Sequence, residues 1–231
     1  VVLYEMLTGD RLFAGDSVAH ILADVLRAPI SFDKLPKDTP RAVRELLKRC
    51  LDRDVKTRLR DIGEARMLKL TDDTIFNYPW LYAVEVGRWY LDETDAARLR
   101  EYLDRGGFLM VDDFHGTLQW ASFMESMQRV FPDRPIIELP DDHPIFHVVY
   151  DLQDRPRIPT LQHLPRGYRN DGSVPHWRAI RDSRGRMIVA ISFNQDIGDG
   201  WEFADEPYYP ERFSTEAIRV GTSYVTYAMT H

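Results

Sequence analysis

"GGFLMVDDFHG", residues 106–116, contains a helix end, a strand and a polar turn in one short stretch. The pair Gly106-Gly107 is typical of the end of a helix, where glycine adopts a left-handed conformation at little cost. The apolar run Phe108–Val111 predicts a strand buried on both faces, as in a parallel sheet covered by helices. Two aspartates and a histidine follow it. The stretch therefore predicts an α/β fold with polar side chains at a strand end.

Similar elements flank this stretch on both sides. Residues 79–86 are rich in aromatic and β-branched side chains, which predicts a strand, and residues 68–70 are a shorter candidate. Residues 91–105 and 120–131 show helical patterns, and residues 135–139 resemble another short strand. This alternation of strands and helices predicts right-handed crossovers and a mostly parallel sheet.

The last part of the chain has a different pattern. Residues 177–180 and 187–193 flank a turn-like segment and predict a β-hairpin. Ser214 is a candidate N-cap of a final helix that extends to about residue 229. Residues 151–176 contain four prolines and little periodicity, which predicts a long loop.

Composition excludes several classes of protein. The chain has 231 residues and a formal net charge of −7, which argues against nucleic-acid binding. No apolar run has the ~18 residues that a membrane span needs. The chain opens on Val1-Val2-Leu3 without the features of a signal peptide, so a cytoplasmic location is expected. The single cysteine, Cys50, excludes an internal disulfide framework and is expected on a buried helical stripe.

The charge distribution indicates two segments. Residues 1–66 contain 13 basic and 11 acidic side chains, whereas residues 67–231 contain 17 and 26. In the first segment, residues 1–7, 17–27 and 39–51 predict helices from their apolar spacing. We therefore expect an all-α segment at 1–66 and an α/β domain at 67–231.

The strings "VVLYEMLTGDRLFAGD" and "LLKRCLDRDVKTRLRDIGEAR" lie within residues 1–66. They closely resemble the C-terminal third of a bacterial serine/threonine protein kinase domain. The resemblance implies that Arg58 is the buried arginine that pairs with a glutamate at the end of the activation segment. Val55 stands where the family usually has proline.

Kinase chemistry also requires a glycine-rich loop, a phosphate-binding lysine, a catalytic aspartate and metal ligands. In the kinase family all of these precede the segment matched here, and this chain contains none of them. Kinase activity is therefore not expected, and ATP is expected only as a ligand of an intact kinase. No cofactor is predicted.

Five strings occur in order within residues 68–231: "IFNYPWLYAVEVG", "LREYLDRGGFLMVDDFHG", "RVFPDRPIIELPDDHPIFH", "HWRAI" and "NQDIGDGWEFAD". They resemble the bacterial domain-of-unknown-function family number 4159, which is similar in fold to ThuA-like proteins and class I glutamine amidotransferases. The resemblance implies a truncated flavodoxin-like, amidotransferase-like sheet with flanking helices. The nucleophile of amidotransferases is a cysteine, and this segment has none, nor a Gly-x-Ser-x-Gly elbow.

Three polar clusters are candidate sites. Asp112, Asp113 and His115 follow a predicted parallel strand, at the edge where open α/β sheets bind ligands. Asp113 and His115 are the candidate catalytic residues, acting as general acid and base. The alternative is that an aspartate caps the next turn and the histidine is exposed.

The other two clusters follow later strands. His143 and His147 could bind a metal. Pro144, however, interrupts the helix that would align the two imidazoles, so no metal is predicted. The alternative is a turn with a solvent-facing histidine. Residues 194–202 contain carboxylate acceptors and an aromatic ring, which could bind a sugar or a hard cation. The alternative is a polar loop that Trp201 anchors to the protein. The ligand candidates there are Asp196, Asp199, Trp201 and Glu202.

Three functions remain open. The first is a non-catalytic binding or scaffold domain, whose ligand could be a small molecule of the carbohydrate type. The second is an uncharacterised hydrolase-like or sugar-modifying enzyme that uses Asp113 and His115. The third is a kinase-fusion fragment, or a junction without a selected function. We also expect His115, His143 and Asp199 to converge, and the chain to self-associate through an unpaired strand edge near residues 80–86.

Overall fold

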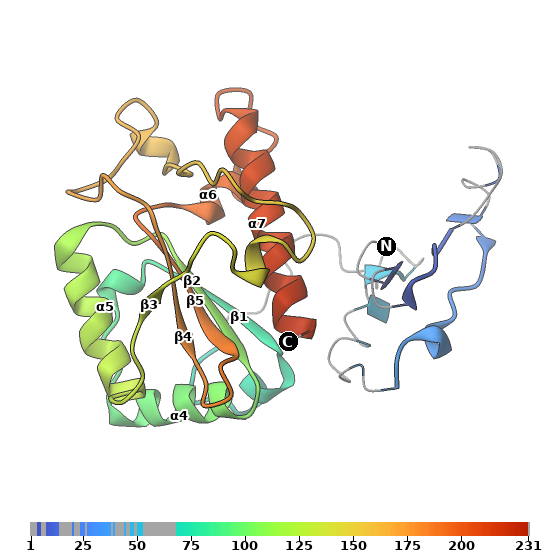
Figure 1. Ribbon diagram of the computed structural model, residues 1–231, viewed down its shortest axis with the longest axis horizontal. Coiled ribbons are helices and arrows are strands. Elements are labelled where there is room, and N and C mark those ends of the chain that lie inside the picture. The colour runs from blue at the N-terminus through green and yellow to red at the C-terminus, as the bar shows by residue number, and fades with distance from the viewer. Residues whose placement is uncertain are drawn as a thin grey trace. The chain divides into compact units, whose positions relative to one another are not determined.

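The computed structural model describes residues 4–5, 8–13, 20, 24–25, 27–37, 39, 44, 47–48, 50–52 and 68–230. The chain divides into two compact units, Val1–Leu68 and Lys69–His231. The second unit holds the sheet and its helices (Figure 1). Arg58, to which the kinase resemblance assigns a structural role, lies outside the described residues.

The described part of the first unit has a few buried apolar side chains, Tyr4, Leu35 and Leu47. A short 3-10 helix, η1, spans Phe32–Lys34. The prediction that Cys50 is buried is wrong, because its side chain is exposed. Leu47 takes the buried position on this helical stretch, and Cys50 is the last helical residue before the turn at residue 51.

The second unit is built on a five-stranded sheet in the order β1-β2-β5-β4-β3. β1 pairs in parallel with β2, and β2 pairs in parallel with β5. β4 is antiparallel to both of its neighbours, β5 and β3. The strands are β1 (Trp80–Val84), β2 (Phe108–Asp112), β3 (Ile137–Glu138), β4 (His176–Arg181) and β5 (Met187–Phe193).

The sheet is therefore mixed in its pairing, whereas the sequence predicted a mostly parallel one. Four strands run in the same direction and β4 runs against them. The predicted hairpin is present as β4 and β5, and it places β5 beside β2. β3 is thereby displaced to the far edge of the sheet, because a hairpin strand occupies the position that the next crossover would otherwise fill.

Helices cover both faces of the sheet (Figure 1). Leu109 and Val111 of β2 pack into one core with α4 and α5, whereas Phe108 and Met110 pack into a second core with α6 and α7. This period-two alternation makes β2 buried on both faces. The helices are η3 (Asp73–Asn77), η4 (Val86–Arg88), α4 (Glu93–Asp104), α5 (Gly116–Val130), η5 (Pro144–Phe146), η6 (Leu161–His163), α6 (Ile197–Glu202) and α7 (Glu211–Thr230).

One predicted helix begins earlier than expected, and one short helix was not predicted. α7 begins at Glu211, so Ser214 is a buried residue inside the helix and not its N-cap. The cause is a turn that starts earlier, where the Phe213 amide donates to the Pro210 carbonyl at 2.9 Å. The polar segment 194–202, predicted to be a loop, contains the short helix α6.

The edge strand β1 differs from the predicted arrangement. Residues 68–70 form no strand; the Asp72 amide donates to the Lys69 carbonyl in a turn, and Leu70 packs on the core. Among the described residues, β1 has a strand partner on one side only. Self-association through this edge stays a prediction.

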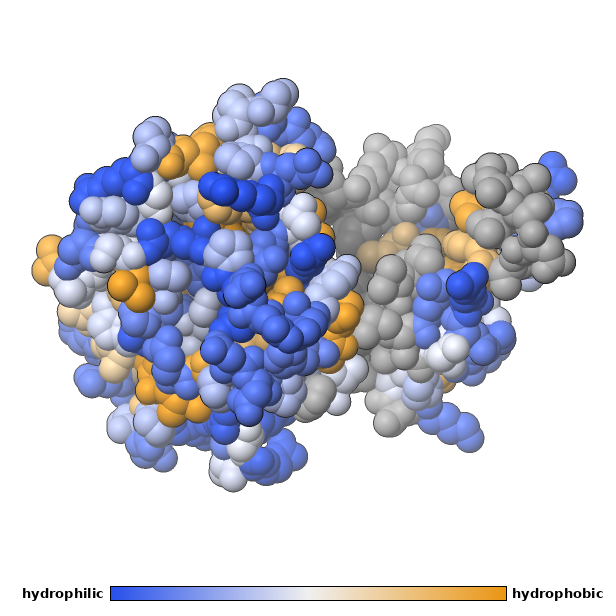
Figure 2. All heavy atoms as spheres, turned by 45° about the horizontal axis from the view of Figure 1, so that its top comes forward, coloured by the Kyte–Doolittle hydropathy of each residue, from blue (hydrophilic) through white to orange (hydrophobic). Residues whose placement is uncertain are grey.

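The face of the second unit in Figure 2 is mostly hydrophilic, with small separate apolar patches. Tyr90 and Leu118 are among the exposed apolar side chains, with exposed fractions of 74% and 87%. None of the described helices is both long and apolar enough to cross a membrane.

We predict that Leu99→Ala in α4 lowers the free energy of unfolding by about 2–5 kcal/mol, because the side chain is fully buried and truncation leaves a cavity. Leu118→Ala in α5 is the matched control and should change it by less than about 0.5 kcal/mol. Urea titration monitored by circular dichroism measures both. Equal losses in the two variants would contradict the assigned core.

Candidate functional site

Three neighbouring strands end in the same unusual backbone conformation. Glu85 follows β1 with φ 51°, Asp113 follows β2 with φ 50°, and Asn194 follows β5 with φ 64°. Positive φ is uncommon for residues other than glycine, and such strain clusters at functional sites. Because the three strands are parallel neighbours, the three residues lie at one edge of the sheet, which we call the carboxyl edge.

Asp112, the last residue of β2, is fully buried at this edge. Its Oδ2 accepts hydrogen bonds from the amides of Ile197 and Gly198, at 2.6 and 3.0 Å, and from the Tyr82 hydroxyl at 3.1 Å. One carboxyl oxygen therefore joins β1, β2 and the start of α6. Glycine is required at position 198, since a Cβ there would lie 2.6 Å from the Tyr82 hydroxyl.

Asp196 provides a second buried carboxyl group beside it. Its Oδ1 caps α6 by accepting from the Asp199 amide at 2.9 Å. Burial and the nearby charge of Asp112 raise the pKa of Asp196 to about 9. Burial also raises the pKa of Asp112, to about 7, although its hydrogen bonds oppose the shift. At neutral pH the pair therefore retains a proton, which we assign to Asp196 because Asp112 has more donors to stabilise its charge.

Asp113 faces two nitrogen-bearing side chains. Its Oδ1 lies 3.1 Å from Nε2 of His115 and 3.6 Å from Nη1 of Arg169. The other Arg169 nitrogen, Nη2, lies 3.9 Å from Oε1 of Glu85. His115 is almost completely buried. Asp113 is thus an oriented carboxylate at a strained strand-to-helix turn.

The turns after β2 and β5 are held together by Asn194. Its amide donates to the Phe114 carbonyl at 3.0 Å, and its Oδ1 accepts from the Gly116 amide at 2.9 Å. Its Nδ2 donates to the Val174 carbonyl at 2.7 Å. These contacts place the Asp112–His115 turn directly beside the Asn194–Asp196 turn.

Residues 166–174, which we call the covering segment, are fastened over these turns. Asn170 donates to the His115 carbonyl at 2.8 Å. Asp171 accepts from the amide and the hydroxyl of Thr117, at 2.9 and 2.8 Å. The segment is therefore tied by hydrogen bonds to the turn that carries Asp113 and His115.

Several enclosed polar atoms at this edge have no hydrogen-bond partner among the residues that the structure describes. Gln195 is fully buried, and both its Oε1 and its Nε2 are without a partner. The same holds for Oδ1 of Asp112 and Nδ1 of His115. Buried polar groups are nearly always paired in native proteins, so such a group requires an explanation, such as a bound water or ligand.

The structure brings together four of the eight predicted site residues. Asp112, Asp113, His115 and Asp196 lie at the carboxyl edge. Asp199 is in α6, where its Oδ2 accepts from the Leu161 amide at 2.6 Å.

Trp201 and Glu202, the two remaining candidates in α6, do not take part in the contacts at the carboxyl edge described above. The Trp201 indole donates to the Ala217 carbonyl at 2.7 Å, and its ring lies 5.2 Å from that of Tyr82, so it anchors α6. Glu202 is exposed at the end of α6.

The structure does not bring the histidines of residues 141–147 to this edge. His143 is buried and caps η5, accepting from the Ile145 amide at 3.3 Å, whereas His147 is exposed and is the solvent-facing histidine of the alternative prediction. Its ring lies 5.8 Å from Tyr227, which packs 6.5 Å from Phe108 at the opposite end of β2.

His147 bonds to Asp151 and to the Asp141 carbonyl, at 2.7 and 2.8 Å. Both of its ring nitrogens are therefore engaged. Among the described residues, no group of three or more His, Cys, Asp or Glu side chains is arranged to hold a metal.

Sequence reasoning missed three residues of the site. Gln195 and Asn194 lie in the polar string after the longest apolar run, a signal that we assigned to the acids alone. Arg169 comes from the predicted long loop, where no periodicity indicates which side chains reach the sheet.

The model of one protein family, described as "Domain of unknown function (DUF4159)", matches residues 28–229. The chain belongs to this family. The resemblance predicted from the five strings is confirmed, and the match extends into the segment before residue 68. A search of the curated proteins finds no match to the chain. The DUF4159 description assigns no activity, so function must be argued from the site itself.

In this DUF4159 domain we predict an unusual pH dependence of stability. Unfolded aspartate has a pKa of about 3.9, so Asp112 and Asp196 hold protons in the folded state that the unfolded chain has released. The free energy of unfolding should fall as the pH rises from about 4 through 7 and toward 9. Asp196→Asn keeps the helix cap and should flatten this decline.

The measurement is urea denaturation at several pH values between 5 and 9. Asp205→Asn, at an exposed position, is the control and should parallel the parent protein. An Asp196→Asn curve with the same slope as the parent would contradict the assignment of the retained proton.

Proposed function

We propose that the carboxyl edge of this domain binds a small hydroxyl-bearing molecule of the carbohydrate type. The observation that carries the proposal is the set of enclosed, unpartnered polar atoms on Asp112, His115 and Gln195. They lie on two adjacent turns that are held in place by backbone hydrogen bonds. A preformed site of this kind has its side chains oriented before the ligand arrives.

The chemistry of these atoms fits a hydroxyl group. Gln195 offers one acceptor and one donor, and Asp112 offers a further acceptor. A hydroxyl both donates and accepts, so a polyol can pair with such a mixed set. A charged ligand has less support, because Asp113 already faces His115 and Arg169.

Access to the site depends on the covering segment. Asp112, His115 and Gln195 have exposed fractions of 0%, 2% and 0%, so a ligand reaches them only if a neighbouring part of the protein moves. The contacts of Asn170 and Asp171 are ordinary hydrogen bonds, which are worth about 1 kcal/mol net each. The proposal therefore includes an opening of this segment, and binding should be slow relative to diffusion.

We predict that Gln195→Met stabilises the ligand-free protein and abolishes sugar binding. The substitution preserves side-chain length and removes two buried polar atoms that each cost about 1–3 kcal/mol when unpaired. Urea denaturation measures the stability, and tryptophan fluorescence titrated with a panel of mono- and oligosaccharides measures the binding.

Gln128→Met, at an exposed position of α5, is the matched control and should change neither property. The proposal fails if Gln195→Met destabilises the protein and leaves binding intact. It also fails if no sugar binds the parent protein.

A second candidate function is hydrolysis, and the Asp113–His115 pair favours it. The carboxylate and the imidazole lie 3.1 Å apart at a strained strand-to-helix turn, as an activated base requires. Asp113 would accept a proton from water, whose oxygen attacks the electrophilic carbon. Asp196 would give its proton to the departing oxygen of the substrate.

For this candidate we predict that Asp113→Asn lowers the rate of hydrolysis by about 10²-fold or more, as expected for loss of a general base. The measurement is a spectrophotometric assay with aryl glycosides and aryl esters. Asp205→Asn is the control and should retain full activity. The rate should decline as the pH rises past about 9, where Asp196 loses its proton. An unaffected Asp113→Asn variant would exclude the mechanism.

We also infer which known fold families the two units are related to. Three parallel strands with helices on both faces support a truncated flavodoxin-like, ThuA-like sheet for the second unit. The kinase resemblance of residues 1–66 rests on the two strings alone. Within this inference the first unit is an inactive kinase remnant, since the chain carries no nucleotide-binding motif.

A further inference from the structure

A solvent-open cavity of about 750 Å³ lies between the first half of α7 and residues 154–156 of the loop between η5 and η6. Its volume is within the range of small-molecule sites. None of its lining residues belongs to the carboxyl-edge site. They are Asp154, Arg155, Pro156, Glu211, Arg212, Thr215, Glu216 and Arg219.

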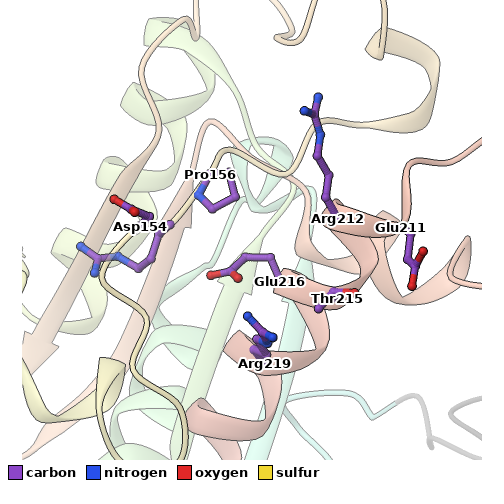
Figure 3. Close-up of a pocket in the computed structure, with 8 residues that line it drawn as sticks. Asp154, Pro156, Glu211, Arg212, Thr215, Glu216 and Arg219 are labelled. Atoms are coloured by element: carbon purple, nitrogen blue, oxygen red, sulfur yellow. The ribbon is translucent and has the colours of Figure 1, made fainter.

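Glu216 distinguishes this cavity from an ordinary charged surface. Figure 3 shows its carboxyl group extending from α7 toward the segment 154–156. The residue is 7% exposed, and its Oε1 is enclosed without a hydrogen-bond partner. Burial raises the pKa of this carboxyl group, and the charges of Arg219 and Arg155 oppose the shift. A buried carboxyl oxygen without a donor is costly, so a donor from a ligand would stabilise it.

The two nearby arginines have different roles. Arg155 is already committed, because its guanidinium lies 3.8 Å from the Phe146 ring and donates to Asp141 at 2.5 Å and to the Leu152 carbonyl at 2.7 Å. Arg219 is exposed, and its guanidinium lies near Glu216 in Figure 3. Within the described part of the chain, its guanidinium lies 5.8 Å from the centre of the Tyr150 ring and forms no ion pair. Arg219 therefore keeps donors for a ligand.

We propose that this cavity binds a compact zwitterion, of the class of free α-amino acids. The ammonium group donates to Glu216, and the carboxylate accepts from Arg219. Each charge of the ligand then meets one opposite charge of the protein, on residues one helical turn apart in α7. A ligand with a single charge leaves one of the two protein groups unmatched, which favours the zwitterion.

Isothermal titration of the full chain with individual free amino acids tests this proposal. We expect at least one amino acid to bind with 1:1 stoichiometry. Acetate and methylammonium, which carry one charge each, should bind at least about tenfold more weakly. The proposal is overturned if no amino acid binds up to about 10 mM, or if either single-charge probe binds equally well.

Two variants assign the binding to Glu216. Glu216→Gln keeps the shape of the side chain and removes its charge, so affinity should fall at least about tenfold. Its melting temperature should not fall, because a buried charge without a donor has been removed. Glu93→Gln changes an exposed carboxylate of α4, outside the cavity, and should bind like the parent protein. Unchanged affinity in Glu216→Gln would overturn the assignment.

Discussion

The hydrogen bonds to the Asp112 carboxyl group are the contacts on which the arrangement of the second unit depends. One buried oxygen accepts from two amides at the start of α6 and from Tyr82, and so fixes β1, β2 and α6 relative to one another. Without it, two amides and a hydroxyl would lose their acceptor in the interior, where an unpaired polar group costs about 1–3 kcal/mol. Burial, and next to it the charge of the same carboxyl group, raise the pKa of Asp196. Asp112 therefore both holds the elements of the site together and affects the pKa of its neighbour.

The strained turns at the carboxyl edge follow from this arrangement. Asp113 and Asn194 reverse the chain directly after β2 and β5, and the hydrogen bonds of Asn194 hold both turns. Each strained residue costs on the order of 1–3 kcal/mol, which surrounding contacts must offset. Gln195 remains unpartnered inside this framework. The strained residues and the unpartnered Gln195 thus lower the folding stability at the edge where polar groups are concentrated, as expected for a binding site.

Local features of the sequence predicted the elements better than their arrangement. The run Phe108–Val111 identified β2 because burial on both faces requires an unbroken apolar strand, and Asp112–His115 were correctly expected at its carboxyl end. The position of β5 beside β2 was missed, since strand order depends on pairing between distant residues and not on periodicity. α6 was missed because six residues with two glycines carry no helical stripe. Gln195 and Arg169 escaped notice because only the folded chain shows what surrounds them.

We infer that the Asp112–Asp196 pair retains a proton at neutral pH, and carbon-13 NMR of the aspartate carboxyl groups measures this directly. The chemical shifts of the two side-chain carbons report protonation as the pH is varied from 3 to 10. We expect Asp112 to titrate with a pKa near 7 and Asp196 with a pKa near 9, and each transition to shift when the other residue is substituted. Titration of both groups near the ordinary aspartate value of about 3.9 would contradict it.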